Sequence, residues 1–404
     1  MRPFFSFNYQ SGFLLYFFLT GLLYALLLAY RSGRESNRAG KWLSLFVLLC
    51  SLNLVPWMLG HSNWYARDGY REVLFFIPFQ QLLLMGPVLF VYVRKVLQPE
   101  VRLSPKTGWH FLPAALYLVY SVVVFVADVW VLDEFYFYAD GIDKDLKLWY
   151  QTLGLLSISG YCGWSLWYYA RYRRSLVNEV SFADVLTFSW IRQFLWALLL
   201  IIFLRTVFLV LFPQFGDFGI KFWYYFAFGL LTYFIAFLGY RHLDRSTALT
   251  AIPQPTLRPW KPDLESPQPT KNPSPDTEVE QICQSIRQLL DQQPLYREPL
   301  LTVSDLAGHL HLPPKSISAA INQGMDMNFN DLINSYRVDA MVRRMKAGEH
   351  REFTLLSLAL DCGFNSKTTF NRAFKKKMGV TPRQFLADLD QPSGKKDPKK
   401  GAKS

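Results

Sequence analysis

The sequence predicts an all-α protein in which a seven-helix transmembrane bundle is followed by a soluble, two-lobed helix-turn-helix domain. The chain has 404 residues, of which 51% are hydrophobic and 17% aromatic, enough for two or three domains. Nearly all of the long apolar runs lie in residues 1–245, and two helix-turn-helix patterns lie in residues 302–377. This uneven distribution predicts a membrane part and a soluble part.

Seven apolar runs approach the length of about 20 residues that a helix needs to cross a bilayer core. A count of six or eight spans is the alternative, and Pro56 is expected to kink the second span. The expected spans are Phe13–Tyr30, Trp42–Leu59, Val73–Val93, Trp109–Leu132, Leu148–Ala170, Trp190–Phe212 and Phe222–Tyr240.

The basic residues between the spans predict their orientation. The segments after the first and third spans each carry four Lys or Arg residues, and the segment after the fifth carries three, with Arg192 at the start of the next span. The alternate segments carry one or two. Because Lys and Arg concentrate in cytoplasmic loops, the N-terminus is expected outside and the C-terminal domain in the cytoplasm. Only Arg2 precedes the first run and more basic residues follow it, which favours an uncleaved span over a signal peptide.

Two charged residues within the spans are candidates for membrane sensing, since a charge in the bilayer is costly. Asp128 and Arg205 both fall in the outer half of the membrane on this topology, where the two can pair. Helix packing or a snorkelling arginine is the favoured explanation, and a role in signal sensing is the alternative. The outer loop Asp133–Asp145 carries many acidic and aromatic residues, and we expect a solvated loop whose tyrosines lie among the headgroups. A site for a cationic or amphipathic ligand is the alternative.

A proline-rich segment separates the two halves, with prolines at 253, 255, 259, 262, 267, 269, 273 and 275. Such a density predicts an extended tether. The expected organisation is a sensor domain at 1–245, a linker at 246–277, a DNA-binding domain at 278–390 and a basic, disordered tail at 391–404. The tail is expected to add only nonspecific attraction to phosphates.

The first helix-turn-helix pattern covers residues 302–322. Thr302 and Asp305 form a capping-box start, His311 lies at the turn, and Pro313 or Pro314 opens the second helix. The outward positions of that second helix are expected to face DNA, and they include Lys315, Ser316 and Ser318.

The second pattern covers residues 354–377 and is the stronger one. Thr354 is expected to cap its first helix, Gly363 to supply the turn, and Asn365 or Ser366 to cap its second helix. Six basic and no acidic residues lie between positions 366 and 383, as expected of a helix that enters a major groove. The candidate DNA-contacting residues on this helix are Lys367, Thr368, Asn371, Arg372, Lys375, Lys376 and Lys377.

A long helix is expected at Phe329–Lys346, between the two patterns. With it, the stretches TVSDLAGHLHLPPKSIS, INSYRVDAMVRRM and LALDCGFNSKTTFNRAFKKKMGVTP resemble the DNA-binding domain of the bacterial AraC/XylS transcription regulators. The resemblance implies two lobes joined by the long helix, with a recognition helix from each lobe in successive major-groove turns. It also implies that Lys367, Thr368, Asn371 and Arg372 face bases, while residues 375–377 face the backbone. The first turn departs from the family pattern, because His311 replaces the usual glycine.

Together these features predict a regulator of transcription embedded in the bacterial inner membrane. Its expected partners are double-stranded DNA, the lipid bilayer, an unknown signal ligand or protein, and a second copy in a homodimer. Four distant cysteines and six unclustered histidines predict no metal site or cofactor, and the absence of GxGxxG and Walker patterns argues against an enzyme. The alternative is a membrane receptor or transporter-like protein whose DNA-binding domain serves autoregulation.

Overall fold

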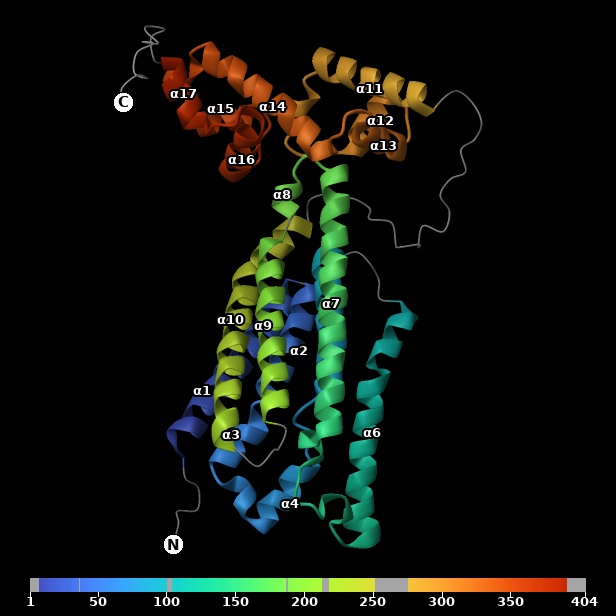
Figure 1. Cartoon of the computed structure of the whole chain (residues 1–404), viewed down its shortest axis with the longest axis vertical. Coiled ribbons are helices and arrows are strands. Elements are labelled where there is room, and N and C mark those ends of the chain that lie inside the picture. Colours follow the sequence, from blue (N-terminus) through green and yellow to red (C-terminus); the bar gives the residue numbers. More distant parts are fainter. Residues whose placement is uncertain are drawn as a thin grey trace, which may run out of the picture. The chain divides into compact units, whose positions relative to one another are not determined.

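The computed structural model describes residues 7–35, 37–99, 104–186, 188–212, 218–250 and 275–390. These residues are largely helical, and one isolated β-bridge is the extent of their strand pairing (Figure 1). Contacts divide the chain into two compact units. The first unit comprises Met1–Arg171 and Phe188–Gln254, and the second comprises Tyr172–Thr187 and Pro255–Ser404.

The first unit is a bundle of helices connected by short 3₁₀ turns. One π-helical turn, Ala127–Leu132, continues the end of α6. The last residues of α7 extend into the second unit. The helices are α1 (Tyr9–Arg34), α2 (Arg38–Leu52), α3 (Val55–His61), α4 (Asp68–Phe76), α5 (Leu82–Leu97), α6 (Leu112–Val126), α7 (Leu148–Glu179), α9 (Ser189–Leu211) and α10 (Phe218–Thr250).

Five segments among the described residues are long and apolar enough to cross a membrane. They correspond to the first, second, fourth, sixth and seventh of the expected spans. The segments are Tyr9–Arg34, Arg38–His61, Pro105–Leu132, Trp190–Leu211 and Gly219–Leu243.

The expected span Val73–Val93 is wrong as a single helix. Helix α4 ends at Phe76 and α5 begins at Leu82. Pro78 explains the break, because proline has no backbone N–H and disfavours helical geometry in the residue before it. The expected span Leu148–Ala170 lies within the 32-residue α7, which is not among the five segments because of its many polar side chains.

Pro56 divides the second span more sharply than a kink would. Helix α2 ends at Leu52, and Pro56 lies in the first turn of the short helix α3. A missing N–H has no cost at that position, because the first turn of a helix leaves its N–H groups unpaired. The two helices together form one membrane-length segment.

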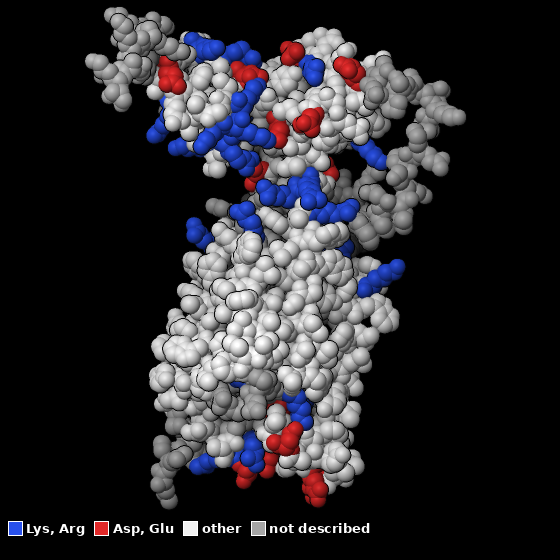
Figure 2. Space-filling view, viewed as in Figure 1, with Lys and Arg blue, Asp and Glu red and all other residues white. Residues whose placement is uncertain are grey.

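Small residues let the helices of the first unit approach closely. Gly21 of α1 lies against Ser51 of α2, and Gly239 of α10 lies against Leu43 of α2, so that a Cβ at either glycine would collide with the facing side chain. Close packing at small residues is typical of membrane helices. Figure 2 shows a broad band without Lys, Arg, Asp or Glu on the visible face of this unit, with charged side chains at both ends.

The second unit contains two helix-turn-helix pairs joined by one long helix, as the sequence predicts. The pairs are α12 with α13 and α15 with α16, and α14 begins and ends at the predicted residues. Buried side chains of all these helices belong to one hydrophobic cluster. The helices are α8 (Ala183–Leu186), α11 (Pro275–Gln292), α12 (Val303–Leu310), α13 (Pro314–Gly324), α14 (Phe329–Lys346), α15 (Leu355–Asp361), α16 (Lys367–Met378) and α17 (Pro382–Asp390).

The predicted linker is shorter than 246–277, because α10 continues to Thr250 and α11 begins at Pro275. The remaining positions, 251–274, lie outside the described residues, as does the predicted basic tail at 391–404.

Candidate DNA-binding surface and a buried polar network

Local hydrogen bonds fix the first helix-turn-helix pair. The side chain of Thr302 accepts from the backbone N–H of Asp305, and the Asp305 carboxylate accepts from the N–H of Thr302 at 2.8 Å, which is the predicted capping box. His311 ends α12 with φ of 53°, a left-handed conformation that few residues other than glycine adopt. The chain thus makes this turn without the glycine that is usual at this position in the AraC/XylS regulators, whose DNA-binding domain its sequence resembles.

The second helix of this pair, α13, begins at Pro314. The predicted DNA-facing side chain of Lys315 is exposed, while Ser316 and Ser318 are half-buried. On the inner side, Ile317 and Ile321 are buried. Polar side chains thus occupy the open face of α13, with one cation among them.

The turn of the second pair requires glycine. Gly363 has φ of +96°, and a Cβ there would lie 2.5 Å from the carbonyl oxygen of Tyr296 and 2.8 Å from that of Arg297. Neither carbonyl can yield easily, because both belong to the backbone. The next residue, Phe364, is 1% exposed and places its ring 5.4 Å from that of Phe370 on α16.

Ser366 caps α16, which resolves the two alternatives that the sequence leaves. Its hydroxyl accepts from the N–H of Thr369 at 3.1 Å. The neighbouring Asn365 side chain instead donates to the carbonyl oxygen of Pro299 at 2.7 Å. The cap and the buried Phe370 and Phe374 fix which face of α16 points outward.

The outward face of α16 carries every residue that the sequence nominates there, and all of them are exposed. Basic side chains gather on the visible face of the second unit in Figure 2. The exposed residues are Lys367, Thr368, Asn371, Arg372, Lys375, Lys376 and Lys377.

Carboxylates already pair with some of these cations. Lys376 lies 2.6 Å from a carboxylate oxygen of Asp331 on α14. Lys377 lies 2.5 Å from a carboxylate oxygen of Asp339 on the same helix. These two lysines therefore also attach α16 to α14.

Arg372 forms an ion pair with Asp184, a residue of α8 in the segment that connects α7 to α9. The Arg372 side chain is 59% exposed and the Asp184 side chain 24% exposed. The sequence places Arg372 among the base-facing residues but gives no reason to expect Asp184 beside it.

A second arginine, Arg337 of α14, was not predicted as a functional residue. It is 0% exposed, and its guanidinium donates to the carbonyl oxygens of Tyr296 at 2.7 Å, Glu298 at 2.7 Å and Ser181 at 3.3 Å. Burial lowers its pKa to about 10, so it is charged at neutral pH. Its spacing from Ile333 and Met341 would have placed it on the inner face of α14.

A network of polar side chains lies inside the first unit. Gln151 of α7 donates to the Oε1 of Gln80 at 2.7 Å and to the carbonyl oxygen of Asp145. Arg205 of α9 donates to the Oε1 of Gln151 and to the hydroxyl of Tyr224, at 3.3 Å, on α10. These hydrogen bonds run from the break between α4 and α5 and the loop before α7 to the C-terminal part of α9 and the N-terminal part of α10.

The pair between Asp128 and Arg205 that the topology allows does not form. Asp128 is 2% exposed and accepts instead from the backbone N–H of Phe137 at 3.3 Å. The π-helical turn at Ala127–Leu132 and the loop after it direct this carboxylate to its own neighbours. The favoured explanation, in which each residue supports local packing, fits these contacts.

The loop Asp133–Asp145 also differs from its prediction as a solvated loop. Its end folds inward, and Asp143, Lys144 and Asp145 are at most 2% exposed. Lys144 donates to the carbonyl oxygen of Phe75 at 2.8 Å, and Asp145 accepts from the N–H of Gln80 at 2.9 Å. Burial, together with the neighbouring Asp145 carboxylate, raises the pKa of Asp143 to about 8.

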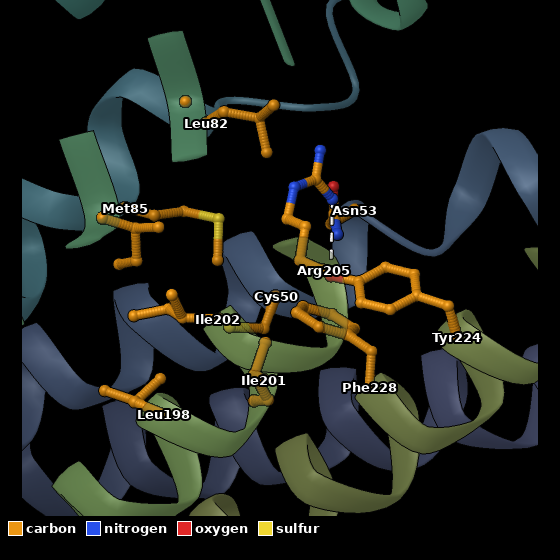
Figure 3. Close-up of a pocket in the computed structure, with 12 residues that line it drawn as sticks. Cys50, Asn53, Leu82, Met85, Leu198, Ile201, Ile202, Arg205, Tyr224 and Phe228 are labelled. Atoms are coloured by element: carbon orange, nitrogen blue, oxygen red, sulfur yellow. Dashed lines mark hydrogen bonds between the residues drawn. The ribbon is translucent and has the colours of Figure 1, made fainter. Parts of the chain in front are cut away.

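A small cavity adjoins this network (Figure 3). Its volume of about 30 Å³ accommodates one or two water molecules. Arg205 and Asn53 lie at one end, and the Oδ1 of Asn53 is buried without a hydrogen-bond partner. The other lining side chains are apolar or weakly polar: Cys50, Leu82, Met85, Ile158, Leu198, Ile201, Ile202, Tyr224 and Phe228.

The four cysteines are buried and unpaired. Within the described ranges, no group of three or more His, Cys, Asp or Glu side chains is placed to hold a metal ion.

Residues 306–388 match a protein family described as a helix-turn-helix domain, which is the AraC-type helix-turn-helix domain. The match begins within α12 and covers α13, α14 and the second pair. It supports DNA-binding transcription regulation. No curated protein and no solved structure matches the chain.

Proposed function

We propose that this protein is a one-component transcription regulator that is embedded in the bacterial inner membrane and binds promoter DNA through its two helix-turn-helix units. The observation that carries the proposal is the outward face of α16, where every nominated polar and basic residue is exposed within a matched helix-turn-helix domain. Arg and Asn side chains suit the donor and acceptor pattern of bases in the major groove. Lysines at the C-terminal end of the helix suit phosphates.

A membrane location is supported by the surface of the first unit. Large apolar side chains that are more than half exposed include Leu23, Leu116 and Phe203, at 54%, 60% and 62%. Apolar surface of this extent is costly in water, whereas lipid tails would cover it at no cost.

Seven spans remain our proposal, with α5 and α7 added to the five membrane-length segments. Helix α7 has 32 residues and would reach roughly 48 Å, more than a bilayer core requires. It exposes Leu153, Leu156 and Trp167, as a lipid-facing helix would. Helix α5 has 16 residues, most of them buried, and would cross inside the bundle.

We further propose that the polar network around Arg205 takes part in sensing. Its hydrogen-bonding groups come from the break between α4 and α5, from the loop before α7 and from three helices. A change in these hydrogen bonds would therefore change how those helices pack. An Arg205→Leu variant should reach normal protein levels but alter the expression of a reporter gene. The control is Thr206→Val, at the exposed neighbouring position whose hydroxyl bonds to the Ile202 carbonyl. Reporter output equal to wild type in the Arg205 variant would remove this role.

The DNA-binding part of the proposal is tested by selection from a random DNA pool with the full-length protein in lipid nanodiscs. We expect enrichment of one sequence motif that is lost in a Lys367→Ala/Arg372→Ala double variant. Enrichment of no motif, or of the same motif by the double variant, would contradict sequence-specific binding through α16.

Orientation is tested separately, with reporter fusions that are active only on one side of the membrane. We expect a fusion after Leu97 and a fusion after Glu179 to report the cytoplasm. A fusion in the loop Asp133–Asp145 should report the outside, and the reverse pattern would rule out contact between the C-terminal domain and DNA.

One observation favours the second candidate, a transporter-like membrane part. The helical structure is interrupted between α4 and α5, and Gln80 in this interruption contacts Asp145 and the Asn53 carbonyl. Interrupted helices that carry polar groups are typical of transport sites. Transport can be measured as the concentration of a small molecule inside and outside cells that contain or lack the protein. Concentrations that do not depend on the protein would set this candidate aside.

A further inference from the structure

The segment that connects α7 to α9 contacts the helix-turn-helix domain, although it lies more than a hundred positions before it in the sequence. Residues 172–187 belong to the same compact unit as that domain. Val180 and Ser181 are 0% exposed, Phe182 is 2% exposed and Leu186 is 0% exposed. We call Val180–Leu186 the clasp.

Backbone hydrogen bonds attach the first residues of the clasp. Val180 forms an antiparallel bridge with Thr302, and the N–H of Ser181 donates to the carbonyl oxygen of Leu301 at 3.0 Å. On the other side, the side-chain amide of Asn330 donates to the Val180 carbonyl at 3.4 Å. The clasp is therefore bonded both to the chain entering α12 and to α14.

Arg337 adds a buried, charged attachment. Its guanidinium donates to the Ser181 hydroxyl at 3.0 Å and to the Ser181 carbonyl at 3.3 Å. If the clasp left, Arg337 would lose both acceptors, and water would have to replace them. The clasp thus occupies a site shaped for it beside the helix that joins the two lobes.

Asp184, toward the other end of the clasp, contacts α16, the expected recognition helix of the second pair. The Asp184 carboxylate pairs with the Arg372 guanidinium, the group that the sequence assigns to base contact. A guanidinium recognises a base or a phosphate with the same donors that it offers to a carboxylate. Asp184 and DNA would therefore compete for Arg372, and the Asp184 charge would repel nearby phosphates.

We propose that the clasp is an intramolecular competitor for DNA, in which Asp184 occupies Arg372 until the clasp is withdrawn by a change in α7 and α9. This inference rests on the proposed function. It gives the membrane part a direct route to α16, because the clasp is the covalent connection between two helices of the polar network. Gln151 lies on α7, and Arg205 lies on α9.

The competition is tested by the affinity of full-length protein in nanodiscs for a mixed-sequence DNA duplex of about 40 base pairs, long enough for two recognition helices in successive turns. The variant Asp184→Asn keeps the size of the side chain and removes its charge. We expect about twofold to fivefold tighter binding than wild type, the range that follows from one partly exposed ion pair.

Two comparisons separate competition from a general effect of charge. Asp388→Asn removes the same charge from an exposed position on α17 and should leave the affinity unchanged. In an Arg372→Ala background, Asp184→Asn should produce no tightening, because its partner is gone.

The outcomes are distinguishable. Tightening in Asp184→Asn that disappears in the Arg372→Ala background supports the clasp. DNA binding that is equal in wild type and Asp184→Asn overturns the clasp but leaves the proposed function standing, as does equal tightening in both backgrounds. Failure of every variant to bind DNA overturns the proposed function and the clasp with it.

Discussion

Replacing Gly363 by alanine should destabilise the second helix-turn-helix pair through two separable effects. The left-handed backbone, with φ of +96°, costs an alanine about 1–2 kcal/mol. The added Cβ would also lie 2.5 Å and 2.8 Å from two backbone carbonyl oxygens. Forced movement of packed groups typically costs about 1–3 kcal/mol more. The total loss in free energy of unfolding should therefore be about 2–5 kcal/mol.

Two other glycines provide matched controls. Gly379 ends α16 with φ of +77° and has no atom within 4 Å of its hypothetical Cβ, so Gly379→Ala should cost only the backbone part, about 1–2 kcal/mol. Gly308 lies within α12 in open space, so Gly308→Ala should stabilise the domain by up to about 1 kcal/mol.

The assay is hydrogen exchange of the amides of α15 and α16, and of α12 for Gly308→Ala, followed by mass spectrometry in the intact chain. This readout follows local opening and does not require the two units to unfold together. A Gly363→Ala loss no greater than the Gly379→Ala loss would refute the assigned clash with the Tyr296 and Arg297 carbonyls.

Three further predictions concern buried or charged groups. The folded protein should hold a proton on Asp143 up to about pH 8, whereas an unfolded chain releases it near pH 4. The free energy of unfolding of the first unit should therefore fall as pH rises between these values, by at most about 1.4 kcal/mol per pH unit for this group. In a pH series of detergent-unfolding curves, Asp143→Asn should reduce this dependence on pH. An unchanged slope in the variant would contradict the assignment. Arg337→Met should raise hydrogen exchange throughout α14 by an amount equivalent to about 3–5 kcal/mol, because buried acceptors lose their donors. Arg337→Lys should recover only part of this loss, because an ammonium lacks the fork geometry of a guanidinium. Full recovery by lysine would show that charge alone matters. Lys375→Ala should reduce the slope of log affinity against log salt by about 1 if this lysine contacts a phosphate, and a change in preferred sequence at constant slope would assign it to a base instead.

The second unit could be predicted from sequence in detail because its signals are local. The Thr302 and Asp305 capping box, the start and end of α14 and the glycine at position 363 all follow from short-range backbone chemistry. The choice between Asn365 and Ser366 as the cap could not be made, because it depends on the Pro299 carbonyl that binds the Asn365 side chain. That contact joins residues 66 positions apart.

The clasp shows where sequence reasoning ends for the same reason. Asp184 is a polar residue in the short segment between two apolar helices. Nothing in the sequence around it indicates Arg372, 188 positions later, as its partner. The burial of Arg337 could have been predicted, since an arginine in register with Ile333 and Met341 must be buried or must distort the helix. Its acceptors, Ser181 included, could not have been named.

The first unit was predicted less well, because hydropathy records composition and not continuity. The apolar run Val73–Val93 passes through Pro78, and the structure divides it into α4 and α5. The pairing of Asp128 with Arg205 rested on depth in the membrane alone. Asp128 accepts instead from the N–H of Phe137 in the loop that follows it, and Arg205 donates to Gln151 of α7.

The central claim, that a membrane-embedded protein reads DNA through α16, is tested most directly by genome-wide chromatin immunoprecipitation of the tagged full-length chain beside a Lys367→Ala/Arg372→Ala double variant. We expect discrete peaks for the wild-type chain and their loss in the double variant at equal protein level in the membrane fraction. Peaks that persist in the double variant, or no peaks above background for wild type and for Asp184→Asn alike, would contradict it.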